Sequence, residues 1–117
     1  MLNTASLKDN RDFRHIYAGG RQSPGRLVVL YTMPNGLSGN RLGVTAGKKV
    51  GNAVTRNRVK RWVKEAYRVL EPGVANGYDI VIVARAAAGA LTRRGAFNAV
   101  GVSMRALLLK QGLYAGG

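Results

Sequence analysis

The sequence predicts an α+β fold in which a small mixed β-sheet packs with three helices. Three observations indicate this class: apolar residues recur with helical spacing in three segments, strand-like segments lie between them, and glycine or proline marks the boundaries. The chain has 117 residues, 46% of them hydrophobic, which is enough for one modest core. We therefore expect a single domain over residues 1–117, in the order helix, two or three strands, helix, strand, helix.

The first helix is predicted near the N-terminus. Ser6 and Asp9 have the spacing of a capping pattern, and the apolar residues Phe13, Ile16 and Tyr17 follow at helical intervals. The two glycines after this segment are expected to end the helix.

Two strands are predicted next. Residues 27–33 are rich in β-branched and aromatic side chains, and their alternation places four of them on one face: Leu27, Val29, Tyr31 and Met33. Residues 41–46 alternate in the same way after a turn at residues 34–36. We expect the second strand to pair back on the first as a hairpin.

The second helix is the clearest element of the sequence. Asn52 is a suitable N-cap, residues 53–70 follow with helical spacing, and residues 71–73, Glu-Pro-Gly, end the helix. One side is apolar and comprises Val59, Trp62, Val63, Ala66 and Leu70. The other side carries Arg56, Lys60, Lys64 and Arg68 at intervals of four residues. Such a helix buries one side and offers the other to a negatively charged partner.

The C-terminal part contains a strand and a helix. Residues 78–84 are apolar apart from Asp79, as expected for a strand covered on both faces. A loop of small residues follows at 84–90, and Thr92 is a candidate N-cap for the last helix. The apolar stripe of that helix comprises Phe97, Val100, Met104, Leu107 and Leu108. Gly95 and Gly101 weaken it by about 1 kcal/mol each relative to alanine.

The charge of the chain points to nucleic acid as its partner. There are 19 Lys and Arg against 5 Asp and Glu, which gives a formal net charge of +14. Residues 41–68 contain nine basic residues and one acid, Glu65, whereas a solvated helix face normally mixes both signs. Arg and Lys side chains suit backbone phosphates better than base edges, so we expect a polyanionic partner.

Other classes of function find little support in the sequence. The chain has no cysteine, and its longest apolar runs are far shorter than the roughly 18 residues that a membrane helix needs. The first residues lack the apolar core of a secretory signal, so we expect a cytoplasmic protein without membrane contact. Asp9, Asp12 and His15 suit a helix N-terminus and an exposed helix surface better than a metal or catalytic site. We predict no catalytic residue and no metal ligand in the protein.

The segment from Lys48 to Arg61, with Arg56-Asn57-Arg58 near its end, resembles the signature of the protein subunit of bacterial ribonuclease P. Further matches at residues 12–17, 29–31, 41–44 and 78–85 extend the resemblance over nearly the whole chain. The resemblance implies that a partner RNA with bound Mg²⁺ is the catalyst and that the complex removes the 5′ leader of precursor tRNA. It also implies a ribosomal protein S5 domain 2-like fold with a left-handed βαβ crossover. We expect the protein alone to bind no cofactor and to be monomeric.

Together with the charge pattern, the resemblance assigns two sets of site residues. The first set contacts the catalytic RNA and comprises Lys48, Lys49, Arg56, Asn57, Arg58, Lys60, Arg61, Lys64 and Arg68. The second set lines a cleft between the second helix and the sheet that holds the single-stranded leader, and comprises Phe13, Tyr17, Val29 and Tyr31. From the residues alone, Phe13 and Val29 suit the core, whereas the two tyrosines and Asn57 suit either role. Aromatic side chains beside a basic groove can stack the bases of a single strand.

Two alternatives stay open at this point. A ribosomal or other structural RNA-binding protein would be equally basic, and an autonomous metal-dependent nuclease would cleave RNA without an RNA partner. The Arg-Asn-Arg signature and the aromatic residues favour the ribonuclease P subunit over the first. Cleavage of precursor tRNA by the pure protein with Mg²⁺ would reveal the second.

Overall fold

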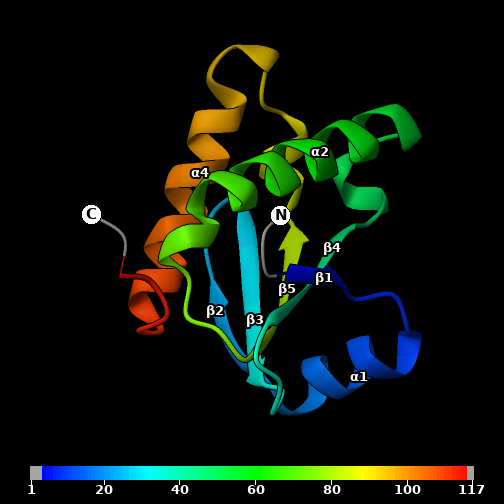
Figure 1. Ribbon diagram of the computed structural model, residues 1–117. Coiled ribbons are helices and arrows are strands. Elements are labelled where there is room, and N and C mark those ends of the chain that lie inside the picture. The colour runs from blue at the N-terminus through cyan, green and yellow to red at the C-terminus, as the bar shows by residue number, and fades with distance from the viewer. Residues whose placement is uncertain (1–3, 116–117) are drawn as a thin grey trace.

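The computed structural model describes residues 4–115, so residues 1–3 and 116–117 of the predicted domain lie outside the described part. The elements in chain order are β1 (Thr4–Ser6), α1 (Asn10–Gly19), β2 (Arg21–Pro24), β3 (Val28–Pro34), β4 (Asn40–Ala46), the 3₁₀ turn η1 (Lys48–Val50), α2 (Ala53–Leu70), the 3₁₀ turn η2 (Glu71–Gly73), β5 (Tyr78–Ala84), α3 (Ala86–Gly89) and α4 (Arg93–Lys110). The strands form one sheet in the order β1-β4-β5-β3-β2 (Figure 1). The predicted α+β class, a mixed sheet packed with helices, is confirmed.

The centre of the sheet is β5, which pairs parallel with β4 and antiparallel with β3. The predicted hairpin between β3 and β4 is therefore wrong, because β5 lies between them. A strand with apolar residues on both faces is stable where both faces are covered, and that position is the middle of the sheet. In Figure 1, α2 lies in front of the sheet and connects β4 to the parallel strand β5, which lies to the left of β4. This connection is the left-handed crossover that the resemblance implies.

The two faces of the sheet have separate cores. On one face, Leu30, Ile80 and Ile82 of the sheet pack with α2 and α4 in the larger buried cluster. On the other face, Val81 of β5 packs with Ile16 of α1 and Leu7 in a smaller cluster. Leu27 was predicted to share a face with Val29, Tyr31 and Met33, but it precedes β3 and lies in the larger cluster.

The N-terminal segment differs from the prediction. Ser6 belongs to β1, which pairs parallel with β4, and the N-cap of α1 is Asp9, whose carboxylate accepts a hydrogen bond from the Arg11 backbone N–H at 2.9 Å. A three-residue edge strand has no periodicity that a sequence pattern could detect. Another strand, β2, pairs antiparallel with β3 and is the optional third strand of the predicted order.

The C-terminal helices also differ in detail. The predicted loop of small residues contains the short helix α3, and Thr92 makes no capping hydrogen bond with its side chain. Gly95 has a φ of +78°, so regular helix begins only after it. The turn exposes the ring of Phe97, which was predicted to be buried, and buries Ala96 in its place.

Candidate nucleic-acid interface

Helix α2 presents its basic side to solvent, as predicted. Asn52 caps it, because its side-chain oxygen accepts a hydrogen bond from the Thr55 backbone N–H at 2.9 Å. The helix spans the predicted residues, and its apolar side is buried in the larger cluster together with Tyr67. The opposite side of this well-anchored helix is therefore held in a fixed orientation, which suits a rigid binding surface.

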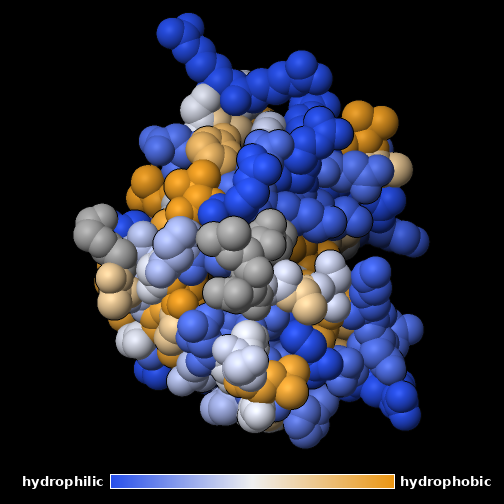
Figure 2. Space-filling model, viewed as in Figure 1, coloured by the Kyte–Doolittle hydropathy of each residue, from blue (hydrophilic) through white to orange (hydrophobic). Residues whose placement is uncertain are grey.

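We name this outer side the basic ridge and define it by Arg56, Asn57, Arg58, Lys60, Arg61, Lys64 and Arg68. Asn57, Arg61, Lys64 and Arg68 are exposed, and the other three are partly buried. Figure 2 shows the hydrophilic surface that runs along α2. Within residues 4–115, the ion pairs join Arg11 to Asp9 and Arg41 to Asp12 and Asp79, so no cation of the ridge is paired. Unpaired and adjacent cations attract a polyanion.

Lys48 and Lys49 lie on η1, between the end of β4 and the start of α2. They line an open hollow of about 520 Å³ together with Val83 and Arg85 at the end of β5. Helix α3 packs closely against η1. A Cβ atom on Gly89 of α3 would lie only 1.8 Å from the carbonyl oxygen of Val50 in η1. Arg85 was not among the predicted site residues. Its position directly after the central strand is the signal that could have revealed it.

The predicted leader-binding residues come together, but on the face of the sheet opposite α2. The rings of Phe13 and Tyr17 on α1 have centroids 6.3 Å apart, and Tyr17 meets Tyr31 of β3 edge to face at 5.0 Å. Val29 lies two residues before Tyr31 and therefore on the same face. The predicted cleft between α2 and the sheet is wrong, because the larger core fills that space.

We name this surface the aromatic face and define it by Phe13, Tyr17, Val29 and Tyr31. The strand register extends it towards the basic hollow, because Val29 is paired with Val83, which lines that hollow. Phe13 lies close to the backbone of β4, where a Cβ atom on Gly43 would come within 2.6 Å of two ring atoms. An aromatic surface that leads into a group of cations can stack bases and hold the phosphates between them.

An ion-pair network ties α1 to the end of the sheet beneath the aromatic face. Arg41 of β4 donates to both carboxylate oxygens of Asp79 on β5, with Nε–Oδ1 at 2.7 Å and Nη2–Oδ2 at 2.5 Å. Its Nη1 also lies 3.5 Å from Asp12 of α1. Burial alone would raise the pKa of Asp79, but hydrogen bonds from Arg41 and Asn35 and the Arg41 charge outweigh it and hold the pKa below its ordinary value. The Arg41–Asp12 pair adds one contact between the sheet and the helix that carries Phe13 and Tyr17.

Few side chains in the part of the chain that the structure describes could act as metal ligands or as a catalytic acid or base. Within residues 4–115, no three His, Asp or Glu side chains come together as metal ligands. His15 is exposed on α1. None of the helices formed by these residues is both long enough and apolar enough to cross a membrane.

Comparisons with known proteins agree on one family. Residues 1–108 match the family model described as ribonuclease P. The chain is 41% identical to the ribonuclease P protein component of Caldanaerobacter subterraneus subsp. tengcongensis over 108 residues, which cover 92% of this chain and 90% of that one. It is 50% identical to the Clostridium botulinum (strain Loch Maree / Type A3) component over 80 residues, 68% and 72% of the two chains. The solved structure of the Staphylococcus aureus RNase P protein matches with a TM-score of 0.82 at 32% identity, covering 94% of this chain and 97% of that one.

Proposed function

The chain belongs to the ribonuclease P protein family, and from this premise we propose that its basic ridge binds the catalytic RNA while its aromatic face binds the 5′ leader of precursor tRNA. As a member of the family it is the protein component of a ribonucleoprotein endoribonuclease of tRNA processing and associates with the RNA subunit. The alternative of a ribosomal or other structural RNA-binding protein is not supported. The assignment of the two surfaces is the proposal.

The observation that carries the proposal is the separation of the two surfaces. The basic ridge lies on α2, on one side of the sheet, and the aromatic face lies on the other side. One protein can therefore contact two RNA segments at the same time. Cations that form no ion pair within residues 4–115 suit the phosphates of a folded RNA, whereas partly exposed rings suit an unpaired strand, whose bases are free to stack.

Lys48 and Lys49 are proposed to serve both surfaces, because η1 leads from β4 into α2. Val83, which is paired with Val29 of the aromatic face, lines their hollow together with Arg85. We assign the phosphates next to the stacked leader bases to these cations. Bond cleavage is left to the RNA and its Mg²⁺, and the protein is proposed to bind no cofactor by itself.

The location and the free state of the protein are part of the proposal. A net charge of +14 on a chain of this size opposes association between two copies, which supports a monomer before assembly. The RNA subunit and precursor tRNA are the proposed partners, and the cytoplasm is the proposed location.

The test is reconstitution with the catalytic RNA subunit and two substrates, precursor and mature tRNA. Phe13→Ala and Tyr31→Ala are expected to lower the affinity of the complex for precursor tRNA about 5- to 150-fold, because one stacked base contributes about 1–3 kcal/mol. The affinity for mature tRNA, which has no leader, is expected to stay within about twofold. Binding measurements with both tRNAs check this.

Two results would contradict the proposal. Equal losses for both tRNAs would mean that the aromatic face does not bind the leader. Cleavage of precursor tRNA by the protein and Mg²⁺ alone, at a rate above that of buffer, would assign the chemistry to the protein instead.

A further inference from the structure

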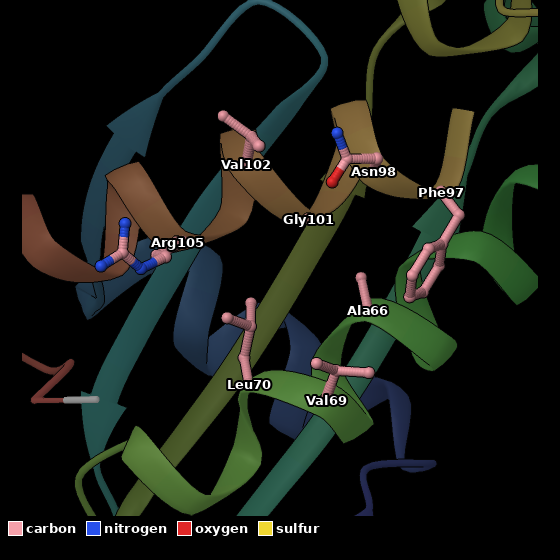
Figure 3. A pocket seen from close by; sticks show the side chains of 8 residues that line it. All are labelled: Ala66, Val69, Leu70, Phe97, Asn98, Gly101, Val102 and Arg105. Carbon is pink, nitrogen blue, oxygen red and sulfur yellow. The ribbon is translucent and has the colours of Figure 1, made fainter. Parts of the chain in front are cut away.

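An apolar groove lies between α2 and α4, next to the basic ridge, and neither proposed RNA surface uses it. Ala66, Val69 and Leu70 of α2 form one wall, and Phe97 and Val102 of α4 form the other. Figure 3 shows the Phe97 ring directed from α4 towards Ala66 and Val69. The groove encloses about 190 Å³.

The groove depends on two glycines of α4. The turn at Gly95 brings the ring of Phe97 to the surface, where the residue is 40% exposed. Gly101 contributes no side chain to the floor, and a Cβ atom there would lie 3.7 Å from the Cβ of Ala66, in ordinary contact. Val69 and Val102 stay 65% and 62% exposed at the rims. An apolar surface of this kind next to a charged one is typical of a binding site.

The size of the groove indicates a single ring system as its occupant. An engineered apolar cavity of about 150 Å³ takes up one benzene molecule, and the groove is slightly larger. Its polar lining groups are the Asn98 amide, which can both donate and accept, and the Arg105 guanidinium, which can donate. The guanidinium carbon of Arg105 lies 5.5 Å from the centre of the Tyr114 ring, which supports it from the segment after α4. A nucleobase has an aromatic face and a hydrogen-bonding edge that fit these two kinds of group.

The charge around the groove indicates RNA rather than another copy of this chain. Arg105 is the charged residue of the lining, and Arg68 of the basic ridge directly precedes Val69. Figure 2 shows hydrophobic surface over α4 beside the hydrophilic surface of α2. Two copies, each with a net charge of +14, would repel each other at this position.

We propose that the groove between α2 and α4 binds one unstacked base of the catalytic RNA, next to the strand whose phosphates lie on the basic ridge. The inference rests on the proposed function, because it needs RNA on α2. It adds a site that contacts a base, whereas the ridge contacts phosphates. The base stacks on Phe97 with its edge towards Asn98 at the same end of the groove, and Arg105 lines the other end.

Crosslinking tests the location of the base. The chain has no cysteine, so Val102→Cys creates a single attachment site for an azidophenacyl group at the rim of the groove. Irradiation of its complex with the catalytic RNA is expected to mark one nucleotide or two adjacent ones. Leu37→Cys, in the exposed turn between β3 and β4, is the control and is expected not to mark them. Marks scattered over the RNA, or the same marks from both variants, would overturn the proposal.

The marked nucleotide then allows a double-mutant cycle. Removing its base and replacing Phe97 by alanine are each expected to weaken binding about 5- to 150-fold, and the two changes together no more than either alone. Fully additive losses would show that Phe97 and this base do not touch, and would overturn the proposal.

A matched pair at Gly101 tests the groove without touching Phe97. Gly101→Leu places a side chain in the groove and is expected to weaken RNA binding by the same factor as the loss of the base. Gly101→Ala also removes the glycine but leaves room for the ring, so its affinity is expected to stay within about twofold. Thermal unfolding confirms that both variants are folded, and the crosslinking result stands independently of them.

Equal affinity of all groove variants and the unaltered chain would overturn the proposal while leaving the proposed function intact. If the unaltered chain does not bind the catalytic RNA at all, the proposed function fails first. Self-association of the unaltered chain in sedimentation experiments, abolished by Gly101→Leu, would assign the groove to a second copy. Saturable binding of an acidic amphipathic peptide, combined with unchanged RNA affinity, would assign it to a protein partner.

Discussion

The two faces of the sheet carry different amounts of buried structure. The face under α2 and α4 is closed, and its core contains residues of β3, β4, η1, α2, β5, α3 and α4. On the other face, Leu7, Ile16 and Val81 are buried, while Phe13 and Tyr31 are only partly buried beside them. The closed face supplies most of the apolar burial that stabilises the fold, and the face with fewer buried contacts has rings and cations left for a ligand.

Neighbouring residues of one strand therefore have separate tasks. Leu30 and Tyr31 are adjacent on β3, yet Leu30 lies in the larger cluster and Tyr31 in the aromatic face. Since alternate side chains of a strand point to opposite faces, substitutions one residue apart can separate stability from binding.

The largest effect is expected from Leu30→Ala. Removing this buried side chain leaves a cavity in the larger cluster, so the free energy of unfolding is expected to fall by about 2–5 kcal/mol. Tyr31→Ala, on the aromatic face, is the control and is expected to cost clearly less stability. Urea unfolding followed by the fluorescence of Trp62 measures both. Equal losses would mean that the two faces contribute equally and that the comparison does not hold.

The ion-pair network at the end of the sheet makes the next effect depend on pH. Asp79 has a side chain only 7% exposed and a pKa below its ordinary value, so its charged form stabilises the folded state. That stability is fully present above about pH 4 and is lost as the pH falls through the folded-state pKa. Asp79→Asn is expected to cost about 1.5–3 kcal/mol at pH 7, the contribution of hydrogen bonds to a charged group.

For the same reason, the difference in unfolding free energy between the unaltered chain and Asp79→Asn is expected to shrink below pH 4. Unfolding in urea at pH 7, 5, 4 and 3 checks this, and a difference that stays constant would show that the Asp79 carboxylate does not act through its charge. Asp12→Asn is the companion variant. Its ion pair with Arg41 is longer and more exposed, so a smaller loss is expected.

Local patterns predicted much of the fold. Helix α2 has the predicted bounds because the Asn52 cap, the 18 helical residues and the following Glu-Pro-Gly all agree. The pairing of β3 and β4 was predicted wrongly, because periodicity identifies strands but not their neighbours. The position of β5 between them follows from apolar burial on both of its faces, which is a property of the whole fold.

In the candidate site, too, a part that lies on one helix could be predicted from the sequence, whereas a part that combines several elements could not. The basic ridge could be predicted because its cations share one side of one helix, and the structure leaves them without ion pairs within residues 4–115. The aromatic face combines α1 with β3, so its residues were named from the resemblance and its place on the sheet was wrong. Phe97 was misplaced because a single glycine turn shifts the helix phase, which a stripe pattern does not include.

Gly43→Ala is expected to have a smaller effect, confined to the aromatic face. The added Cβ would lie 2.6 Å from ring atoms of Phe13, so the ring must move away from the sheet. The affinity of the reconstituted enzyme for precursor tRNA is expected to fall about tenfold, in the range of one weakened stacking contact. Gly101→Ala, on α4 away from the aromatic face, is the matched control, because its added Cβ would make an ordinary contact, 3.7 Å from the Cβ of Ala66. An unchanged affinity in Gly43→Ala would show that the position of Phe13 does not matter for the leader.

The smallest effect is expected from a single cation of the basic ridge. Arg61 is exposed and forms no ion pair with any residue of 4–115, so Arg61→Ala is expected to weaken binding of the catalytic RNA about three- to tenfold and to leave the unfolding free energy unchanged within about 0.5 kcal/mol. The slope of log affinity against log salt concentration is expected to fall by about 1, because one phosphate contact is lost. Arg11→Ala removes an equal charge from α1, where Asp9 already pairs with it at 3.1 Å, and is expected to change the slope less. Equal slope changes in both variants would mean that the RNA responds to the net charge of the chain and not to the ridge on α2.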